Sequence, residues 1–438
     1  MKTNVPKRIA GILFNALKSG VVPRVGLEYV TVGRTQEISA ILSDIDMIAE
    51  GGATFRFIVG KYGSGKSFLL QTIRNYATAK GFVVVDADLS PERRFAGTKG
   101  QGLATYKELV QNLSTKSKPD GGALPLILEK WLLGVQAAVR QKSDATEAEF
   151  DLLVEKEIFA TAESLSGMVN GFEFAKAIAT YWRGHLEDNQ SKKMNVLKWF
   201  RGEYPSRKES KDELGINFIV SDETWYDFIK ILAIFFVSAG YKGMLIVIDE
   251  LVNIFKIPHQ VSRNNNYEKI LTMYNDTLQG KAKHIGFLMG GTPQCIEDKY
   301  RGIFSYEALR SRIAKGHFAS EDTKDLQAPI IRLDMLLREE MYILIEKLQL
   351  IHSELFDYAP LLSHEDLLYF LTVEYNRVGA KTHITPREII RDFIELISIL
   401  HQNPGRKAAE VLGSNSFELS KSGLSEDEIH SDFAEFEV

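Results

Sequence analysis

The residues whose types and spacing most directly indicate chemistry lie in the octapeptide GKYGSGKS, residues 60–67. A glycine followed, after four residues, by Gly-Lys-Ser is the spacing of a loop that wraps the phosphates of a nucleotide. Its glycines let the backbone turn tightly and bring bare N–H groups against phosphate oxygens. The lysine supplies a cation for the β- and γ-phosphates, and the serine hydroxyl is a ligand for Mg²⁺. The predicted ATP-binding residues are Gly60, Tyr62, Gly63, Ser64, Gly65, Lys66, Ser67 and Phe68.

An acidic pair ends a second apolar run, GMLIVIDE, at residues 243–250. Four or more apolar residues followed by Asp-Glu form the Walker B arrangement, which accompanies a phosphate-binding loop in many ATPases. We expect Asp249 to hold Mg²⁺ together with Ser67, usually through water. We expect Glu250 to orient and polarise the water that attacks the γ-phosphate.

These side chains can meet only if strands and helices alternate around them. A βαβ order with buried, nearly continuous apolar strands predicts an α/β fold, with three layers around a parallel sheet. Asp86 and Asp88 fall at the carboxyl edge of that sheet, on the side where ligands bind. They could bear on a metal or water, although we expect them to cap helices. The predicted elements are strands at 55–59, 82–88, 244–248 and 285–289, and a helix at 67–80.

Three further positions resemble accessory residues of AAA+ ATPases. Thr292 follows the strand 285–289, where such proteins carry a polar sensor residue; an ordinary strand-to-helix turn with Pro293 at the first helical position is the alternative. Arg310 and Arg312 follow at the distance of an arginine finger, which stabilises charge on the transferring phosphoryl group from a neighbouring subunit. A pair of exposed arginines in a helical turn is the alternative for these two residues.

Two more arginines are candidate nucleotide contacts. Arg34 lies in the VGR-x-x-E segment at 32–37, which is similar to a segment near the adenine in AAA+ proteins; an exposed loop arginine is the other interpretation. Thr385 has the features of a helix cap, since proline follows it and glutamate stands three residues later. Arg387 then lies at a helix N-terminus, against the preference of the helix dipole, which favours a phosphate partner.

Composition limits the function classes. The chain has 438 residues, 45% hydrophobic residues, 25% charged residues and a net charge of −5. This acidic balance argues against a general nucleic-acid coat protein, so any nucleic acid would have to bind a local basic patch. Cys295 is the only cysteine, which excludes an intrachain disulfide. Because no signal peptide and no membrane-length apolar run stand out, we expect a cytoplasmic protein without a membrane partner.

Two basic stretches leave their role open. Residues 192–211 mix lysines and arginines with Trp199, Phe200 and Tyr204, which could grip phosphates and stack on bases. Interspersed acidic residues favour a solvated helix end. The loop 93–99 could touch nucleotide or a partner, or be solvated.

The pattern also predicts a division into parts. The predicted parts are an N-terminal helix and adenine-side segment (1–30), an ATPase core with a helical insertion at about 103–240 (31–325), a C-terminal lid or winged-helix domain (326–413), and an acidic, disordered or docking tail (414–438).

With these residues set out, the chain closely resembles the BREX-system ATP-binding proteins of BrxD type from bacterial phage-defence islands. The similarity extends from about residue 9 to about residue 413. The stretches that carry it are VGLEYVTVGR, GKYGSGKS, RRF-x-GT-x-GQ-x-L, WFRGEY, LIVIDELVNIFKIP, SRNNNYEKIL, GFLMGGTP, SYEALRSR and TPREIIRDF.

The resemblance implies an AAA+ ATPase related to the origin-recognition and initiator branch, encoded beside a large helicase-like protein. It implies ATP-driven defence on or near DNA. If Arg310 or Arg312 acts on a neighbouring subunit, catalysis requires a homo-oligomer. The site residues of the family transfer to Lys66, Ser67, Asp249 and Glu250 by direct motif match. Two other interpretations stay open: a nucleotide-dependent assembly switch or scaffold with little turnover, and an ATP-dependent DNA clamp or loader.

Overall fold

The computed structural model of the chain describes residues 3–142, 146–164, 171–314, 324–377 and 385–413. The chain forms two compact units. The first unit contains residues 1–34, 62–65 and those from 335 onward; the second contains residues 35–61 and 66–334.

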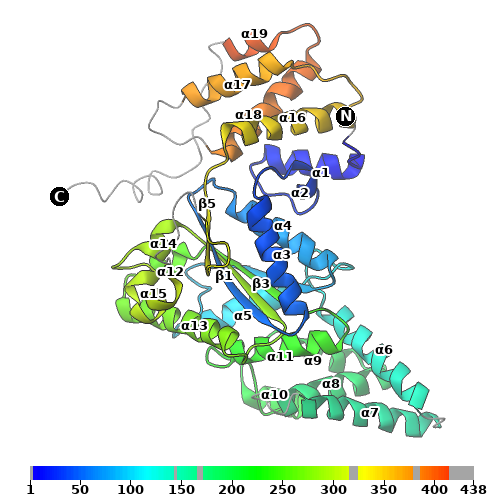
Figure 1. Ribbon diagram of the computed structural model, residues 1–438. Helices are drawn as coiled ribbons and strands as arrows, with labels where there is room; N and C mark the ends of the chain where they lie inside the picture. Colours follow the sequence, from blue (N-terminus) through cyan, green and yellow to red (C-terminus); the bar gives the residue numbers. More distant parts are fainter. Residues whose placement is uncertain (1–2, 143–145, 165–170, 315–323, 378–384, 414–438) are drawn as a thin grey trace. The chain divides into compact units, whose positions relative to one another are not determined.

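A five-stranded sheet, parallel throughout, forms the centre of the second unit (Figure 1). The strand order is β2-β3-β4-β1-β5, so β4 lies between β1 and β3. The sheet confirms the α/β class and the four predicted strands. The strands are β1 (Ala53–Gly60), β2 (Val83–Asp88), β3 (Met244–Asp249), β4 (Ile285–Gly291) and β5 (Ile330–Leu333).

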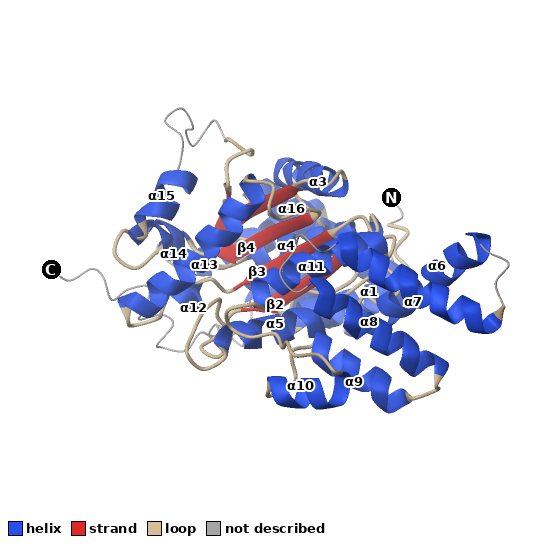
Figure 2. Cartoon of the chain, turned by 90° about the horizontal axis from the view of Figure 1, so that it is seen from below, coloured by secondary structure: helices blue, strands red, loops and turns tan. Residues whose placement is uncertain are grey.

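Alternate residues of each strand enter two different apolar clusters, because successive side chains point to opposite faces of a sheet. Ile58 packs with α3 (Thr35–Ala49) and α4 (Lys66–Ala79) in one cluster. Its neighbours Phe57 and Val59 pack in the other, which includes buried residues of α5 (Gln101–Gln111), α11 (Trp225–Ser238) and α13 (Gln260–Leu278). Figure 2 shows the strands of this unit with helices on both faces. Burial on both faces explains why the strands read as continuous apolar runs.

The fifth strand was not predicted. Its residues pair with β1, with Val59 opposite Arg332 and Gly60 opposite Leu333. The sequence-based division assigned residues 326–413 to the C-terminal domain, whereas this pairing joins β5 to the sheet. The remaining boundaries stay predictions.

Helices α5 to α11 fill the chain between β2 and β3. Consecutive members from α6 to α9 lie side by side (Figure 1). Trp199, Phe200 and Tyr204 are only 1%, 0% and 5% exposed here, and the Trp199 indole donates to the Phe218 carbonyl oxygen at 2.7 Å. These three rings belong to the core, so the proposed stacking on nucleic-acid bases is wrong for them. The other helices are α6 (Leu124–Lys142), α7 (Glu147–Ser164), α8 (Gly171–Leu186), α9 (Gln190–Phe200) and α10 (Arg207–Leu214).

A buried ion pair fastens the sheet to its flanking elements. Arg56 on β1 donates twice to Asp44 on α3, both times at 2.7 Å, and Asp44 is 5% exposed. The same guanidinium donates to the Ala328 carbonyl oxygen at 2.7 Å, just before β5. A bidentate arginine–carboxylate pair fixes geometry as well as charge, so this contact sets the approach of α3 and of the β5 edge.

In the first unit, the N-terminal helix α1 (Lys7–Lys18) packs against α16 (Arg338–Leu355) and α18 (Pro386–Gln402). Phe14 meets the His352 ring edge-on at 5.2 Å, and the Lys7 ammonium lies 2.6 Å from a carboxylate oxygen of Asp357. The predicted cap of α18 is confirmed, since Thr385 and the glutamate three residues on form a capping box. The described residues from 335 onward form helices, and the winged-helix form stays a prediction. The other helices of this unit are α2 (Leu27–Val30), α17 (His364–Arg377) and α19 (Ala408–Gly413).

Short helical elements also lie between β3 and β5. They are α12 (Val252–Phe255), α14 (Pro293–Glu297), a 3₁₀ turn (Ile303–Ser305) and α15 (Glu307–Ile313). In the part of the chain that the structure describes, no helix is both long enough and apolar enough to cross a membrane.

Candidate functional site

The glycine loop turns by means of two left-handed glycines. Gly63 has φ +79° and Gly65 has φ +85°, a region that side chains with a Cβ rarely adopt. Between them, the Ser64 hydroxyl oxygen is buried without a hydrogen-bond partner among the described residues. The carbonyl oxygen of the same residue accepts from the Arg34 guanidinium at 3.1 Å. The loop therefore turns at the glycines that the motif requires, and the hydrogen-bonding capacity of the Ser64 hydroxyl is unused within the described residues.

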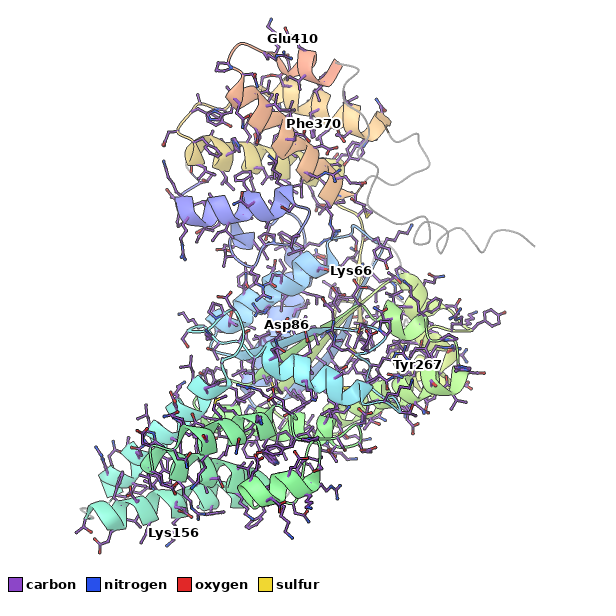
Figure 3. All side chains as sticks on the ribbon, turned by 180° about the vertical axis from the view of Figure 1, so that it is seen from behind. Lys66, Asp86, Lys156, Tyr267, Phe370 and Glu410 are labelled. Carbon is purple, nitrogen blue, oxygen red and sulfur yellow. The ribbon has the colours of Figure 1, made fainter. Side chains whose placement is uncertain are left out.

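Lys66 and Ser67 begin α4, directly after the loop. The Lys66 ammonium (labelled in Figure 3) donates to the carbonyl oxygens of Gly60 at 2.8 Å and Lys61 at 3.1 Å. Burial lowers the pKa of Lys66, while the carboxylates of Asp249 and Glu250 act in the opposite direction. The cation thus lies at the carbonyl oxygens of Gly60 and Lys61 and within the electrostatic reach of the acidic pair.

A direct bond joins the glycine-loop motif to the acidic pair. The Ser67 hydroxyl donates to a carboxylate oxygen of Asp249 at 2.8 Å. The strands β1 and β3 bring these residues together because their carboxyl ends lie at the same edge of a parallel sheet. The other carboxylate oxygen of Asp249 accepts from the backbone N–H of Glu250 at 2.8 Å.

Gly290 on β4 makes room for this arrangement, and the sequence alone did not single it out. A Cβ built on Gly290 would lie 2.2 Å from the Oδ1 atom of Asp249. The strand between the two motif strands therefore needs a residue without a side chain at this point. The signal was present as the glycine pair that ends the run GFLMGG, but its reason lies in a neighbouring strand.

Several carboxylates share this edge of the sheet. Asp88 on β2 pairs in register with Asp249. Burial, followed by the charges of Asp249 and Asp88, raises the pKa of Glu250. The pKa of Asp88 is raised by its restricted hydration and then by Asp249 and Asp86, although its side chain reaches solvent. A divalent cation would relieve this crowding of negative charge.

Asp86 has a different role from the expected helix cap. Its carboxylate (labelled in Figure 3) accepts from the Arg74 guanidinium of α4 at 3.0 Å. Arg74 is buried and also donates to the Ser114 hydroxyl at 2.6 Å and to the Pro119 carbonyl oxygen at 2.8 Å. This network ties the helix that follows the loop to β2.

Thr292 caps the short helix α14 at the end of β4, between the ends of β1 and β3. Its hydroxyl accepts from the N–H of Cys295 at 3.4 Å, with proline at the next position. An accepting hydroxyl retains its own hydrogen, so capping and contact with a phosphate are compatible. Cys295 is buried, and burial raises the pKa of its thiol to about 11. The sensor role of Thr292 stays a prediction.

The remaining predicted residues are described by their own surroundings. Arg310 donates to the Glu307 carboxylate at 3.2 Å, and Arg312 donates to the Ala308 carbonyl oxygen at 2.6 Å, both inside α15. The exposed Arg387 belongs to the first unit, where its side chain lies near Gly20. Tyr62 is exposed and Phe68 is half-buried.

The chemistry of the donor set fits Mg²⁺ bound with a nucleotide. Mg²⁺ prefers oxygen ligands and usually takes only one or two from the protein, with phosphates and waters completing its octahedron. Ser67 and Asp249 offer one hydroxyl and one carboxylate in contact. Among the described residues, no group of three or more histidine, cysteine, aspartate or glutamate side chains could hold a metal ion without such help.

The parallel sheet, with a glycine loop after β1 and an acidic pair after β3, is consistent with a P-loop-type core. The sequence model of the BREX system ATP-binding protein BrxC/D family matches residues 5–416, and the chain belongs to that family. No significant match was found among curated proteins. Family membership supports an ATP-binding role in a BREX defence system.

Replacing Gly290 by alanine tests the packing of the site. The added Cβ would displace the Asp249 carboxylate, so we expect the affinity for ATP in the presence of Mg²⁺ to fall by about 10- to 100-fold. Isothermal titration calorimetry measures this affinity. Gly134→Ala on α6 is the matched control, because a Cβ there meets nothing within 4 Å. Unchanged affinity in Gly290→Ala would show that the position of Asp249 does not matter for binding.

Proposed function

We propose that this protein hydrolyses ATP to ADP and phosphate with the help of Mg²⁺. The observation that supports this most directly is the 2.8 Å bond between the Ser67 hydroxyl and the Asp249 carboxylate. One residue comes from the start of the helix after the loop and the other from the end of a separate strand, and ATPases bring these two positions together around a metal. The ATP-binding role of the family agrees with this reading.

The residues of the chain divide the work of the reaction. The loop amides and Lys66 neutralise the phosphate oxygens, for which Lys66 exchanges its bonds to the loop carbonyls. Glu250 orients a water, whose oxygen forms a bond to the γ-phosphorus while the bond to the β–γ bridging oxygen breaks. The proton of the water passes to Glu250. Ser67 and Asp249 would hold a Mg²⁺ ion, which would supply charge stabilisation on the phosphate oxygens.

Two variants separate hydrolysis from binding alone. Glu250→Gln keeps shape and hydrogen bonding and removes the base, so we expect ATP to bind normally and turnover to fall by about 10²- to 10⁴-fold. Lys66→Ala should lose binding itself. Phosphate release and equilibrium binding measure the two effects. A parent protein that binds ATP but releases no phosphate would instead support the assembly-switch interpretation.

We also propose that Arg312 acts as an arginine finger toward a neighbouring copy of the chain. Arg312 is exposed on α15, whereas Arg310 forms an ion pair with Glu307, three residues before it in the same helix. A guanidinium that reaches an adjacent site would stabilise charge on the transferring phosphoryl group. Catalysis would then require an oligomer.

Removing this guanidinium tests the finger. We expect Arg312→Ala to lower turnover by about 10³-fold or more while ATP affinity is retained, because the residue serves another subunit. Arg310→Ala is the matched control on the same helix. The wild-type protein should also lose turnover per subunit on dilution. Constant turnover across dilution, or a loss confined to Arg310→Ala, would contradict the assignment.

Arg34 and Arg387 are further proposed nucleotide contacts. In the first unit, Arg34 donates to the Ser64 carbonyl of the loop tip. Thr385, two residues before Arg387, lies against Gly63, since a Cβ on that glycine would come 2.6 Å from the Thr385 methyl carbon. These contacts, inside one unit, support a link between α18 and the loop tip.

We propose, from the resemblance of the motifs, that the protein acts with DNA and a helicase-like partner. With a net charge of −5, DNA binding would use a local basic patch or the C-terminal helices. In a mobility-shift assay with ATP, the affinity for DNA should fall by roughly 10-fold or more between 50 and 200 mM salt, because phosphate contacts release counterions. A shift that is independent of salt, or none at any salt, would count against DNA as a ligand.

A further inference from the structure

Asn253, the second residue of α12, connects the acidic turn to Leu89, the residue that follows β2. Its side-chain amide donates to the carbonyl oxygen of Leu89 at 2.9 Å, and at a longer 3.4 Å to that of Glu250. Its backbone N–H donates to the Glu250 carbonyl oxygen at 3.0 Å. The residue is partly buried.

The turn that carries Glu250 is conformationally demanding. Glu250 has φ +63°, in the left-handed region that residues other than glycine and asparagine seldom adopt. Such conformations persist only where the surroundings hold them, and they concentrate at functional sites. A small change in this backbone would swing the Glu250 carboxylate, because the side chain departs directly from the strained residue.

Bonds hold the turn from two sides. On the β4 side, the N–H of Leu251 donates to the Gly290 carbonyl oxygen at 3.1 Å. On the β2 side, the N–H of Leu89 donates to the Asp249 carbonyl oxygen at 3.1 Å. Asn253 completes the β2 side, because its side-chain amide donates to the carbonyl oxygen of the same Leu89.

We propose that Asn253 is a positioning residue for Glu250, which holds the left-handed turn so that the carboxylate faces the attacking water. This inference rests on the proposed ATP hydrolysis. It assigns Asn253 no contact with nucleotide: its amide is used on the two backbone carbonyls. The expected effect of its loss is therefore on turnover and not on ATP affinity.

The test compares turnover and affinity in Asn253 variants. We expect Asn253→Ala to lower kcat by about 10- to 100-fold, the scale of a small misplacement of a reacting group, and to leave the ATP Kd within about two-fold. Asn253→Asp keeps the shape without the amide donor and should resemble alanine. Asn253→Gln keeps the donor and should recover part of the rate. Asn112→Ala is the matched control, since Asn112 makes a similar bond to a β2 carbonyl, that of Asp86, at 2.9 Å.

A double variant separates positioning from a general structural effect. In a Glu250→Gln background, measured in single turnover, Asn253→Ala should cause no further loss, because residues that act through one group are not additive. A full additional loss in that background overturns the inference, as does parental kcat in Asn253→Asp. A parent that binds ATP without hydrolysing it overturns the proposed function and this inference together, whereas an active parent with an unaffected Asn253→Ala overturns only the inference.

Discussion

The hydrogen bond between the Ser67 hydroxyl and the Asp249 carboxylate is the contact on which the site depends. It exists because β1 and β3 end at the same edge of a parallel sheet, with β4 between them. It also requires a residue without a side chain on β4 beside Asp249, and Gly290 is that residue. Three strands that are distant in sequence are thus constrained by a single pair of side chains.

The frame around this contact explains which parts of the fold were predictable. The strands β1 to β4 are buried on both faces, so each has an apolar run that marks it in the sequence. β5 has only four residues and includes Arg332, which is partly exposed and pairs with Glu297 on α14. A short edge strand with a charge inside it carries no such signal. The packing of α1 on α16 and α18 was equally hidden, because it joins the two ends of the chain.

The site shows the same limit. Lys66, Ser67, Asp249 and Glu250 could be predicted as candidates because their motif spacing indicates the chemistry. The steric role of Gly290 and the proposed role of Asn253 could not be predicted, since they depend on a close approach between neighbouring strands and on two backbone carbonyls across a turn. The basic and aromatic run around Trp199 suggested stacking on bases, yet its rings are buried, because composition alone does not tell a core ring from an exposed one.

The single thiol of the chain has a practical consequence. Cys295 is buried behind the end of β4, and its raised pKa keeps it in the unreactive protonated form near neutral pH. A cysteine introduced at an exposed position of either unit would therefore react with a maleimide dye at that position alone, with the native residue left in place. Pairs of such dyes, one on each unit, would report the separation of the two units as nucleotide is added, without removing Cys295 from a packed core.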